Sequence, residues 1–413
     1  MRFASILILI PYFINAQQPE RCATVLYNKL AEQKNPALAE KRNAFNRTVE
    51  KLMRENKYEG NRSVITIPVV VHVVYRTNLE NISDAQIQSQ IDVLNEDYGR
   101  MNPDTTLTPA PWKPMAANTG IQFCLASRKP NGEWTNGIER KQSLVDTTWQ
   151  PDNSVKFSSS HGLDSWGSHD YLNIWVCNLV TPFLGFSTFP GGDSLEDGVV
   201  IVSRAFGRIN FVSPPFDRGR TTTHEVGHWL NLMHVWGEDG GSCLGTDVIT
   251  DTPNQADFTQ GCPSFPVYDN CSPTYPGIMF MNYMDYTYDA CMNMYTLEQS
   301  ARMNLVLNTQ RVSILTSSGC LAPNSVDEID VNRRVTVYPN PDQHEIHFRC
   351  TECIGEKIYV SIFDMTGKEI FGMNISSASL SNSIDVSSLD NGIYFLQLRG
   401  KNISAASRFI LIR

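Results

Sequence analysis

Residues 221–234 contain the histidine pattern that most constrains the fold of this chain. His224, Glu225 and His228 form the pattern His-Glu-x-x-His, and a third histidine follows at His234. On a helix, side chains four residues apart share one face. The two imidazoles can therefore bind one Zn²⁺ with Glu225 beside them as a base, and His234 adds a third ligand after the helix ends. Three protein ligands leave the fourth position open, which is typical of a catalytic zinc site.

The spacing to His234 is that of the metzincins, which usually have glycine where this chain has Asn231. Glycine suits that position because the helix ends there in a left-handed conformation and the chain returns toward the metal. Asparagine is the next most tolerant residue in that conformation, so Asn231 is a tolerated replacement. The alternative, three unrelated surface or core histidines, accounts for neither Glu225 nor the spacing.

The length of 413 residues predicts two or three units. Residues 1–16 have one positive charge, a short apolar run and a closing Ala16, which is typical of a secretory signal peptide. Export agrees with the ten cysteines, and no other stretch is apolar enough to span a membrane. The net charge of −9 argues against a nucleic-acid partner.

Residues 17–62 are polar, and their plainest interpretation is a flexible tail. From there to residue 320, strand and helix patterns alternate. β-Branched and apolar runs predict strands at residues 64–75, 172–180 and 198–203. Apolar spacing predicts a helix after its cap at Ser83, and a capping box at Thr296 and Gln299 starts a last helix that runs to about Arg311. We therefore expect an α+β domain over residues 63–320, with a mixed sheet backed by helices.

Residues 321–333 read as a linker, and residues 334–413 differ in character from the rest of the chain. Short alternating strands separated by turn residues predict a small all-β sandwich there.

The domain at residues 63–320 resembles the pappalysin-type metzincins, the group that includes ulilysin. Beyond the histidines, the resemblance is carried by Asn282–Tyr286 and Asp289–Met292. It implies that Met284 lies in a tight turn under the metal. It also implies that Tyr286 swings toward the zinc and stabilises the oxyanion by donating its hydroxyl proton.

Four cysteines lie between His234 and the last helix: Cys243, Cys262, Cys271 and Cys291. The sequence allows three pairings. The family resemblance implies Cys243–Cys271 and Cys262–Cys291. Each cross-link would restrict the unfolded chain by about 3 kcal/mol.

The stretch Thr246–Pro253 resembles the calcium-binding stretch of the same family. Asp247, Asp251 and Thr252 offer hard oxygen ligands for Ca²⁺. The alternative interpretation is a solvated acidic turn.

The segment Arg21–Thr24 resembles the cysteine switch of this family's propeptide, with Ala23 where glycine is expected. A Cys22 thiolate there would fill the open zinc position and exclude water. The alternative is that Cys22 forms a disulfide, because the five cysteines that remain cannot all pair among themselves. These are Cys124, Cys177, Cys320, Cys350 and Cys353.

The C-terminal segment resembles the sorting domain of proteins exported by the type IX secretion system. Val337–Pro341, Phe363–Lys368 and Leu389–Leu396 carry the resemblance. It implies a secreted or cell-surface protein, exported through the periplasm, with the secretion machinery as a partner. The alternative is a carbohydrate-binding or adhesive sandwich. The Cys350–Cys353 spacing suggests a local disulfide or two free thiols.

Together these patterns predict a secreted zinc endopeptidase made as a latent precursor. Glu225 would take a proton as water attacks the scissile carbonyl, and an edge strand would bind the extended substrate. The competing hypotheses are a non-catalytic surface adhesin with this fold and a zinc hydrolase acting on something other than a peptide. A carboxylate near the methionine turn, Asp285 or Asp289, could favour Arg or Lys after the cut.

Overall fold

The computed structural model describes most of the chain in two compact units that divide after residue 323. The described residues are 21–55, 64–145, 148–322, 335–339, 345–350, 357–365, 367–376, 381–400 and 404–411. The predicted signal peptide and most of the predicted linker lie outside them. None of the helices within these ranges is both long and apolar enough to cross a membrane.

The first unit is built on a mixed sheet whose longest strand, β1, spans Ile65–Tyr75. The other strands are β2 Ile121–Leu125, β3 Ile138–Gln142, β4 Leu172–Cys177, β5 Gly185–Ser187 and β6 Val199–Val202. Their order is β2-β1-β4-β6-β5, with β3 also paired to β1. All pairs are parallel except β5 with β6, so an antiparallel strand stands at one edge. The predicted mixed sheet is confirmed.

Helices α3 Asp84–Tyr98 and α4 Arg220–Trp229 pack against this sheet, and α5 Leu297–Leu307 contributes Met303 and Leu307 to the same core. Ser83 caps α3, and Thr296 forms the predicted capping box of α5 with Gln299. Short 3₁₀ helices occupy Pro103–Leu107, Lys113–Met115, Ser154–Lys156, Ser158–Ser160, Ser203–Ala205 and Val312–Thr316.

The prediction that the last helix runs to about Arg311 is wrong. α5 ends at Leu307, because the N–H groups of Gln310 and Arg311 both donate to the carbonyl of Val306 and tighten the chain into a turn. The Arg311 guanidinium then forms a bidentate ion pair with Asp197, at 2.6 and 2.9 Å.

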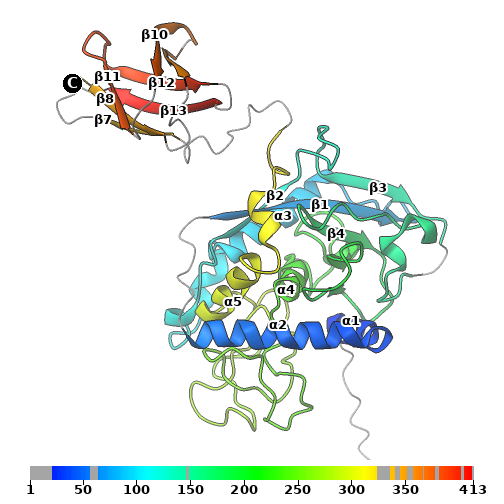
Figure 1. The fold of residues 1–413 in the computed structure, drawn as a ribbon. Coiled ribbons are helices and arrows are strands. Elements are labelled where there is room, and N and C mark those ends of the chain that lie inside the picture. Colours follow the sequence, from blue (N-terminus) through cyan, green and yellow to red (C-terminus); the bar gives the residue numbers. More distant parts are fainter. Residues whose placement is uncertain are drawn as a thin grey trace, which may run out of the picture. The chain divides into compact units, whose positions relative to one another are not determined.

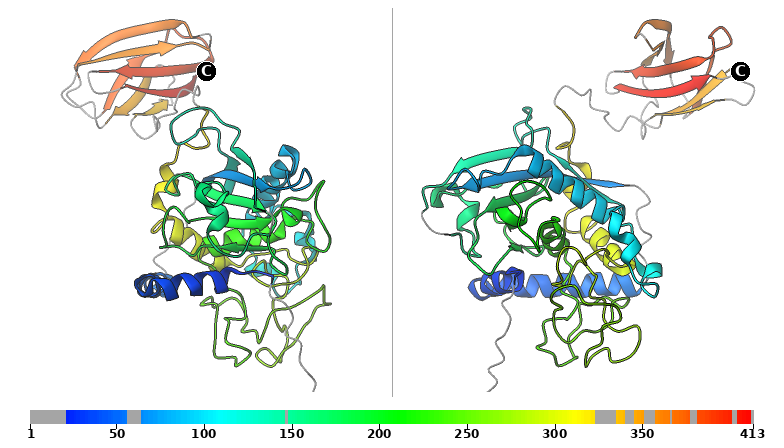
Figure 2. Two further views of the ribbon diagram at one scale, coloured as in Figure 1. Left: turned by 90° about the vertical axis from the view of Figure 1, so that its right-hand side faces the viewer. Right: turned by 180° about the vertical axis from the view of Figure 1, so that it is seen from behind.

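The polar N-terminal segment forms two helices, α1 Thr24–Lys34 and α2 Pro36–Arg54, rather than a tail. Figures 1 and 2 show them on the side of α4 that faces away from β1. In α2, Val49 is buried, and the Asn46 side chain accepts hydrogen bonds from Asn231 and Arg302, both at 2.9 Å. The N-terminal segment is therefore packed against the domain.

Between α4 and α5, where every residue is described, the chain forms no helix or strand. Two disulfides cross-link this irregular segment, Cys243–Cys271 and Cys262–Cys291, the pairing that the family resemblance implied. A third disulfide joins Cys124 to Cys320. Cys22 and Cys177 are buried free thiols. Cys353 and the side chain of Cys350 lie outside the described residues.

The second unit contains only strands in its described residues. They are β7 Val335–Pro339, β8 Glu345–Cys350, β9 Lys357–Phe363, β10 Glu369–Ser376, β11 Ser381–Asp385, β12 Gly392–Arg399 and β13 Ser404–Leu411. Two antiparallel sheets, β10-β9-β12-β13 and β11-β8-β7, share one core that includes Phe348 and Leu396. The predicted all-β unit is confirmed.

Candidate active site

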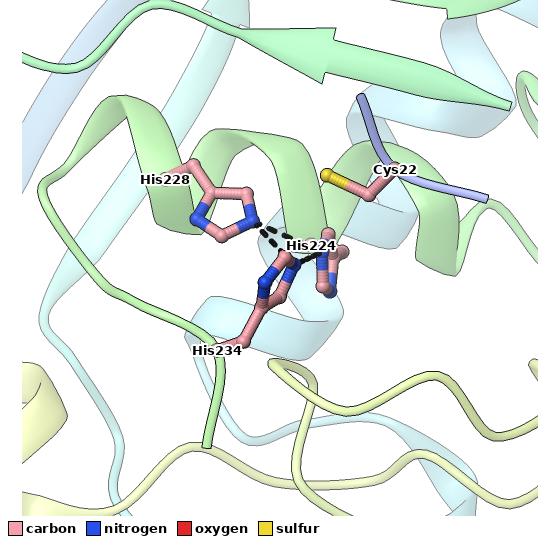
Figure 3. A group of neighbouring side chains, drawn as sticks. All are labelled: Cys22, His224, His228 and His234. Atoms are coloured by element: carbon pink, nitrogen blue, oxygen red, sulfur yellow. Dashed lines mark hydrogen bonds between the residues drawn. The ribbon is translucent and has the colours of Figure 1, made fainter. Parts of the chain in front are cut away.

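Three histidines converge where α4 ends. His224 and His228 lie one turn apart on α4, and His234 lies on the chain that follows (Figure 3). Their Nε2 atoms are 3.0–3.1 Å apart, and all three side chains are buried. A tetrahedral zinc with Zn–N bonds of about 2.0–2.1 Å would hold its nitrogens at roughly this separation. The geometry therefore suits a single small metal ion.

The second nitrogen of each ring has an acceptor that sets the tautomer. Nδ1 of His224 lies 2.7 Å from the carbonyl oxygen of Tyr283, and Nδ1 of His228 lies 2.7 Å from that of Leu232. Nδ1 of His234 is hydrogen-bonded to the carboxylate of Glu238. Because these acceptors require Nδ1–H donors, each neutral ring presents an unprotonated Nε2 to a metal. The donor set fits zinc.

Asn231 makes the turn that brings His234 back to the other two rings. Its φ is +71°, the left-handed conformation in which glycine is usual. The N–H of Leu232 donates to the carbonyl of Gly227 at 2.9 Å, which closes the end of the helix.

His234 is held by two residues that sequence reasoning missed. The Trp236 ring stacks on the His234 imidazole at 4.2 Å between centroids, and the Glu238 carboxylate accepts a hydrogen bond from Nδ1 of that imidazole. Because His234 lies outside the helix, these side chains orient its ring. Their signal in the sequence is only their closeness to the third histidine.

Met284 and Tyr286 flank the histidines. Met284 is fully buried against α4, and a Cβ added at Gly227 would lie 2.6 Å from its sulfur. The Tyr286 ring lies 5.0 Å from that of His234 and 5.7 Å from that of His224. The Tyr286 hydroxyl donates to the Cys22 carbonyl at 3.3 Å.

Glu225 is buried beside the histidines and is bonded to the N-terminal segment. Its Oε2 accepts a 2.7 Å hydrogen bond from the Thr24 hydroxyl, which in turn accepts the Ser187 N–H at 2.9 Å. Burial raises the pKa of Glu225 to about 7. Thr24, for which we predicted no role of its own within the segment Arg21–Thr24, thus covers the carboxylate.

The fourth side chain at the centre is Cys22 (Figure 3). Its sulfur and one ring nitrogen from each histidine all lie within 4.8 Å of one another. Burial raises the pKa of this thiol well above its usual value. A bound cation would act in the opposite direction, since metals favour the thiolate.

The segment around Cys22 pairs with β5, the last strand of the sheet. Cys22 forms a parallel bridge with Gly185, and the Ala23 N–H donates to the Gly185 carbonyl at 2.9 Å. Further bonds join Leu184 N–H to the Arg21 carbonyl and Ser187 N–H to the Thr24 hydroxyl.

One turn along α1, the Asn28 carboxamide continues this pairing. It donates to the Ser187 carbonyl at 2.8 Å and accepts the Phe189 N–H at 3.2 Å. The side-chain amide of Asn28 therefore bonds the same backbone carbonyl and N–H that the peptide group of an added strand would bond.

Arg21 extends into a pocket next to Tyr286. Its guanidinium lies 4.9 Å from the Phe216 ring centroid and 5.1 Å from that of Tyr286, and it donates to the Asp285 carbonyl at 3.1 Å. Burial lowers the pKa of this guanidinium, and Asp289 is the carboxylate that most opposes this shift.

The two aspartates near the methionine turn differ in their contacts. The Asp285 carboxylate accepts hydrogen bonds from the Gln255 side chain and from the N–H groups of Thr259 and Tyr286. In Asp289, Oδ2 accepts two backbone N–H groups, while Oδ1 is buried with no hydrogen-bond partner in the described structure.

The stretch with the predicted calcium ligands lies away from the histidines. The Thr252 hydroxyl donates to the carboxylate of Asp247, and one Asp251 oxygen accepts the Glu298 N–H. Burial raises the pKa of Asp247 to about 7. The other Asp251 oxygen is buried with no hydrogen-bond partner in the described structure.

Comparison with known proteins identifies the family. Residues 158–308 match the model described as pregnancy-associated plasma protein-A, and residues 336–412 match a secretion system C-terminal sorting domain. An extracellular metalloprotease of Arthroderma otae is 33% identical over 250 residues, 58% of this chain and 76% of that protein.

Solved structures agree with this assignment. Mature mirolysin of Tannerella forsythia in complex with a cleaved peptide is 53% identical, with a TM-score of 0.61 over 62% of this chain and 97% of that chain. A promirolysin mutant from the same organism is 47% identical, with a TM-score of 0.67 over 72% of this chain and 97% of that chain. With its converging histidines, this chain belongs to the pregnancy-associated plasma protein-A family, the pappalysin-type metzincins, and is a secreted zinc endopeptidase with a C-terminal sorting domain.

Proposed function

We propose that His224, His228 and His234 bind the catalytic zinc and that Glu225 is the general base for peptide hydrolysis. The observation that carries this proposal is the convergence of three Nε2 atoms beside a buried carboxylate. When bound, zinc supplies Lewis acidity toward water and the scissile carbonyl oxygen.

The side chains around the metal supply the other parts of the mechanism. Glu225 removes a proton from the attacking water and delivers it to the leaving amine. Tyr286, once released from the Cys22 carbonyl, donates a hydrogen bond from its hydroxyl to the developing oxyanion. Met284 supports the site from beneath.

We also propose that residues 17–62 are a propeptide that keeps the enzyme latent. The Cys22 thiolate takes the metal position that water needs, while Thr24 occupies Glu225. The hydrogen bonds of Arg21, Ala23, Thr24 and Asn28 fill the strand edge on which an extended substrate would pair.

The position of Arg21 supports a preference for Arg or Lys after the cleaved bond. Arg21 lies next to the metal site and within the electrostatic reach of Asp289, whose free Oδ1 lacks a partner. We propose that a substrate arginine takes its place once the propeptide leaves.

Calcium binding at Asp247, Asp251 and Thr252 belongs to the same proposal. Burial raises the pKa of Asp247, the nearby Asp251 carboxylate raises it further, and one Asp251 oxygen has no hydrogen-bond partner in the described structure. A cation there would neutralise this repulsion. The sorting domain, at residues 334–413, would engage the type IX secretion machinery.

Hydrolysis of denatured casein, with and without a zinc chelator, tests the function. We expect cleavage that the chelator abolishes and Zn²⁺ restores. No cleavage by the processed, zinc-loaded protein would favour the adhesin hypothesis or a hydrolase for another substrate. Cleavage that survives removal of all zinc would contradict the metal assignment.

A further inference from the structure

The pocket that holds Arg21 also contains a second arginine. This cavity of about 440 Å³ lies beside the metal site, because Leu184 and Tyr286 border it. Its lining contains Arg21 and Arg204 but no carboxylate; the other lining residues are apolar or uncharged.

Arg204, which follows β6, is half-buried at this pocket. Among the described residues, no side chain or carbonyl forms a hydrogen bond or ion pair with its guanidinium. Burial lowers its pKa, and no neighbouring carboxylate offsets this effect. Arg208, four residues on, differs: it forms a bidentate ion pair with Glu96 at 2.6 and 2.8 Å.

Loss of the propeptide would remove Arg21 and leave Arg204 as the single charged side chain of this lining. A guanidinium whose donors are free binds a carboxylate through two parallel hydrogen bonds. We propose that Arg204 is a specificity-determining residue that favours substrates with a carboxylate in the second or third position after the cleaved bond. This inference rests on the proposed function, in which the first position after the bond occupies the place of Arg21.

The carboxylate could belong to an Asp or Glu side chain or to the C-terminus of a short peptide. Fluorogenic peptides with one arginine separate the two sources. In the first set the C-terminus is amidated, and the second or the third position after the bond is Asp, Asn or Lys. In the second set that position is Asn, and the peptide ends there in a free carboxylate.

For the mature enzyme, we expect kcat/KM for at least one amidated Asp peptide, or for one Asn peptide with a free C-terminus, to exceed kcat/KM for the amidated Asn peptide by on the order of 10-fold. Arg204→Gln should abolish this preference, so that kcat/KM for the Asp peptide no longer exceeds kcat/KM for the Asn peptide. Arg204→Glu should shift the preference to Lys. As the control, Arg208→Gln should retain the wild-type preference.

Equal cleavage of all these peptides, or an acidic preference that survives in Arg204→Gln, would overturn the assignment of Arg204 while leaving the peptidase mechanism intact. Absence of zinc-dependent cleavage of every peptide would overturn both proposals.

Discussion

Replacing Cys22 by serine should make the precursor leak activity before any cleavage of the chain. A serine hydroxyl binds zinc far more weakly than a thiolate, so water regains the fourth position whenever the segment lifts. Five hydrogen bonds to β5 and its flanking residues still hold the segment down.

The size of the leak follows from these bonds. At a net value of about 0.5–1 kcal/mol each, these five bonds alone hold the segment with roughly 2.5–5 kcal/mol, so at most about 0.02–1.5% of molecules would be open. Adding Thr24→Val and Asn28→Ala removes three of the five bonds. About 1–2 kcal/mol then remains, and the activity should rise to roughly 3–15% of that of the mature enzyme.

Initial rates on a fluorogenic peptide measure the leak, and intact-mass spectrometry shows that the propeptide is still attached. Cys177→Ser, at the other buried free thiol, is the matched control and should stay silent. Alkylation should find Cys22 protected while zinc is bound and reactive after chelation. A Cys22→Ser precursor as silent as wild type, or Cys22 found in a disulfide, would refute the reasoning.

Three further predictions concern the metal sites and the second unit. Glu238→Gln should weaken zinc binding by about 10- to 100-fold in a chelator competition, because a carboxylate makes His234 a stronger ligand than an amide does; unchanged affinity would contradict that role. Millimolar calcium should raise the melting temperature, and increasingly so from about pH 4 to pH 7. Burial raises the pKa of Asp247 to about 7, so the folded state binds more protons than the unfolded state across that window, and without a cation stability falls as the pH rises. Melting curves indifferent to calcium would remove the calcium assignment alone. Deleting residues 331–413 should leave an active peptidase in a heterologous host and strand it in the periplasm of the native host; normal amounts in the medium would favour a binding domain.

Local patterns predicted the features that depend on neighbours in the chain. The spacing of His224 and His228 predicts a shared helix face, and the caps at Ser83 and Thr296 start helices in the structure. The predicted end of α5 was wrong, because Arg311 pairs with Asp197, a residue 114 positions away that the local pattern does not include.

Contacts between distant segments escaped prediction. The bond from Thr24 to Glu225 spans 201 residues, and no periodicity relates the two. Glu238 follows His234 by four residues, yet helical spacing says nothing about it because this part of the chain is not helical. The packing of α2 against Asn231 likewise depends on the folded domain, because the hydrogen bond between Asn46 and Asn231 joins residues 185 positions apart.

The most direct test of the central claim is a joint measurement of zinc content and kcat for mature Glu225→Ala. The substitution leaves all three histidines and their Nδ1 partners in place, so one zinc per chain should remain bound. Without the base, kcat should fall by at least about 10²-fold. A variant with stoichiometric zinc and most of the wild-type peptidase activity would contradict the assignment of Glu225, and with it the mechanism.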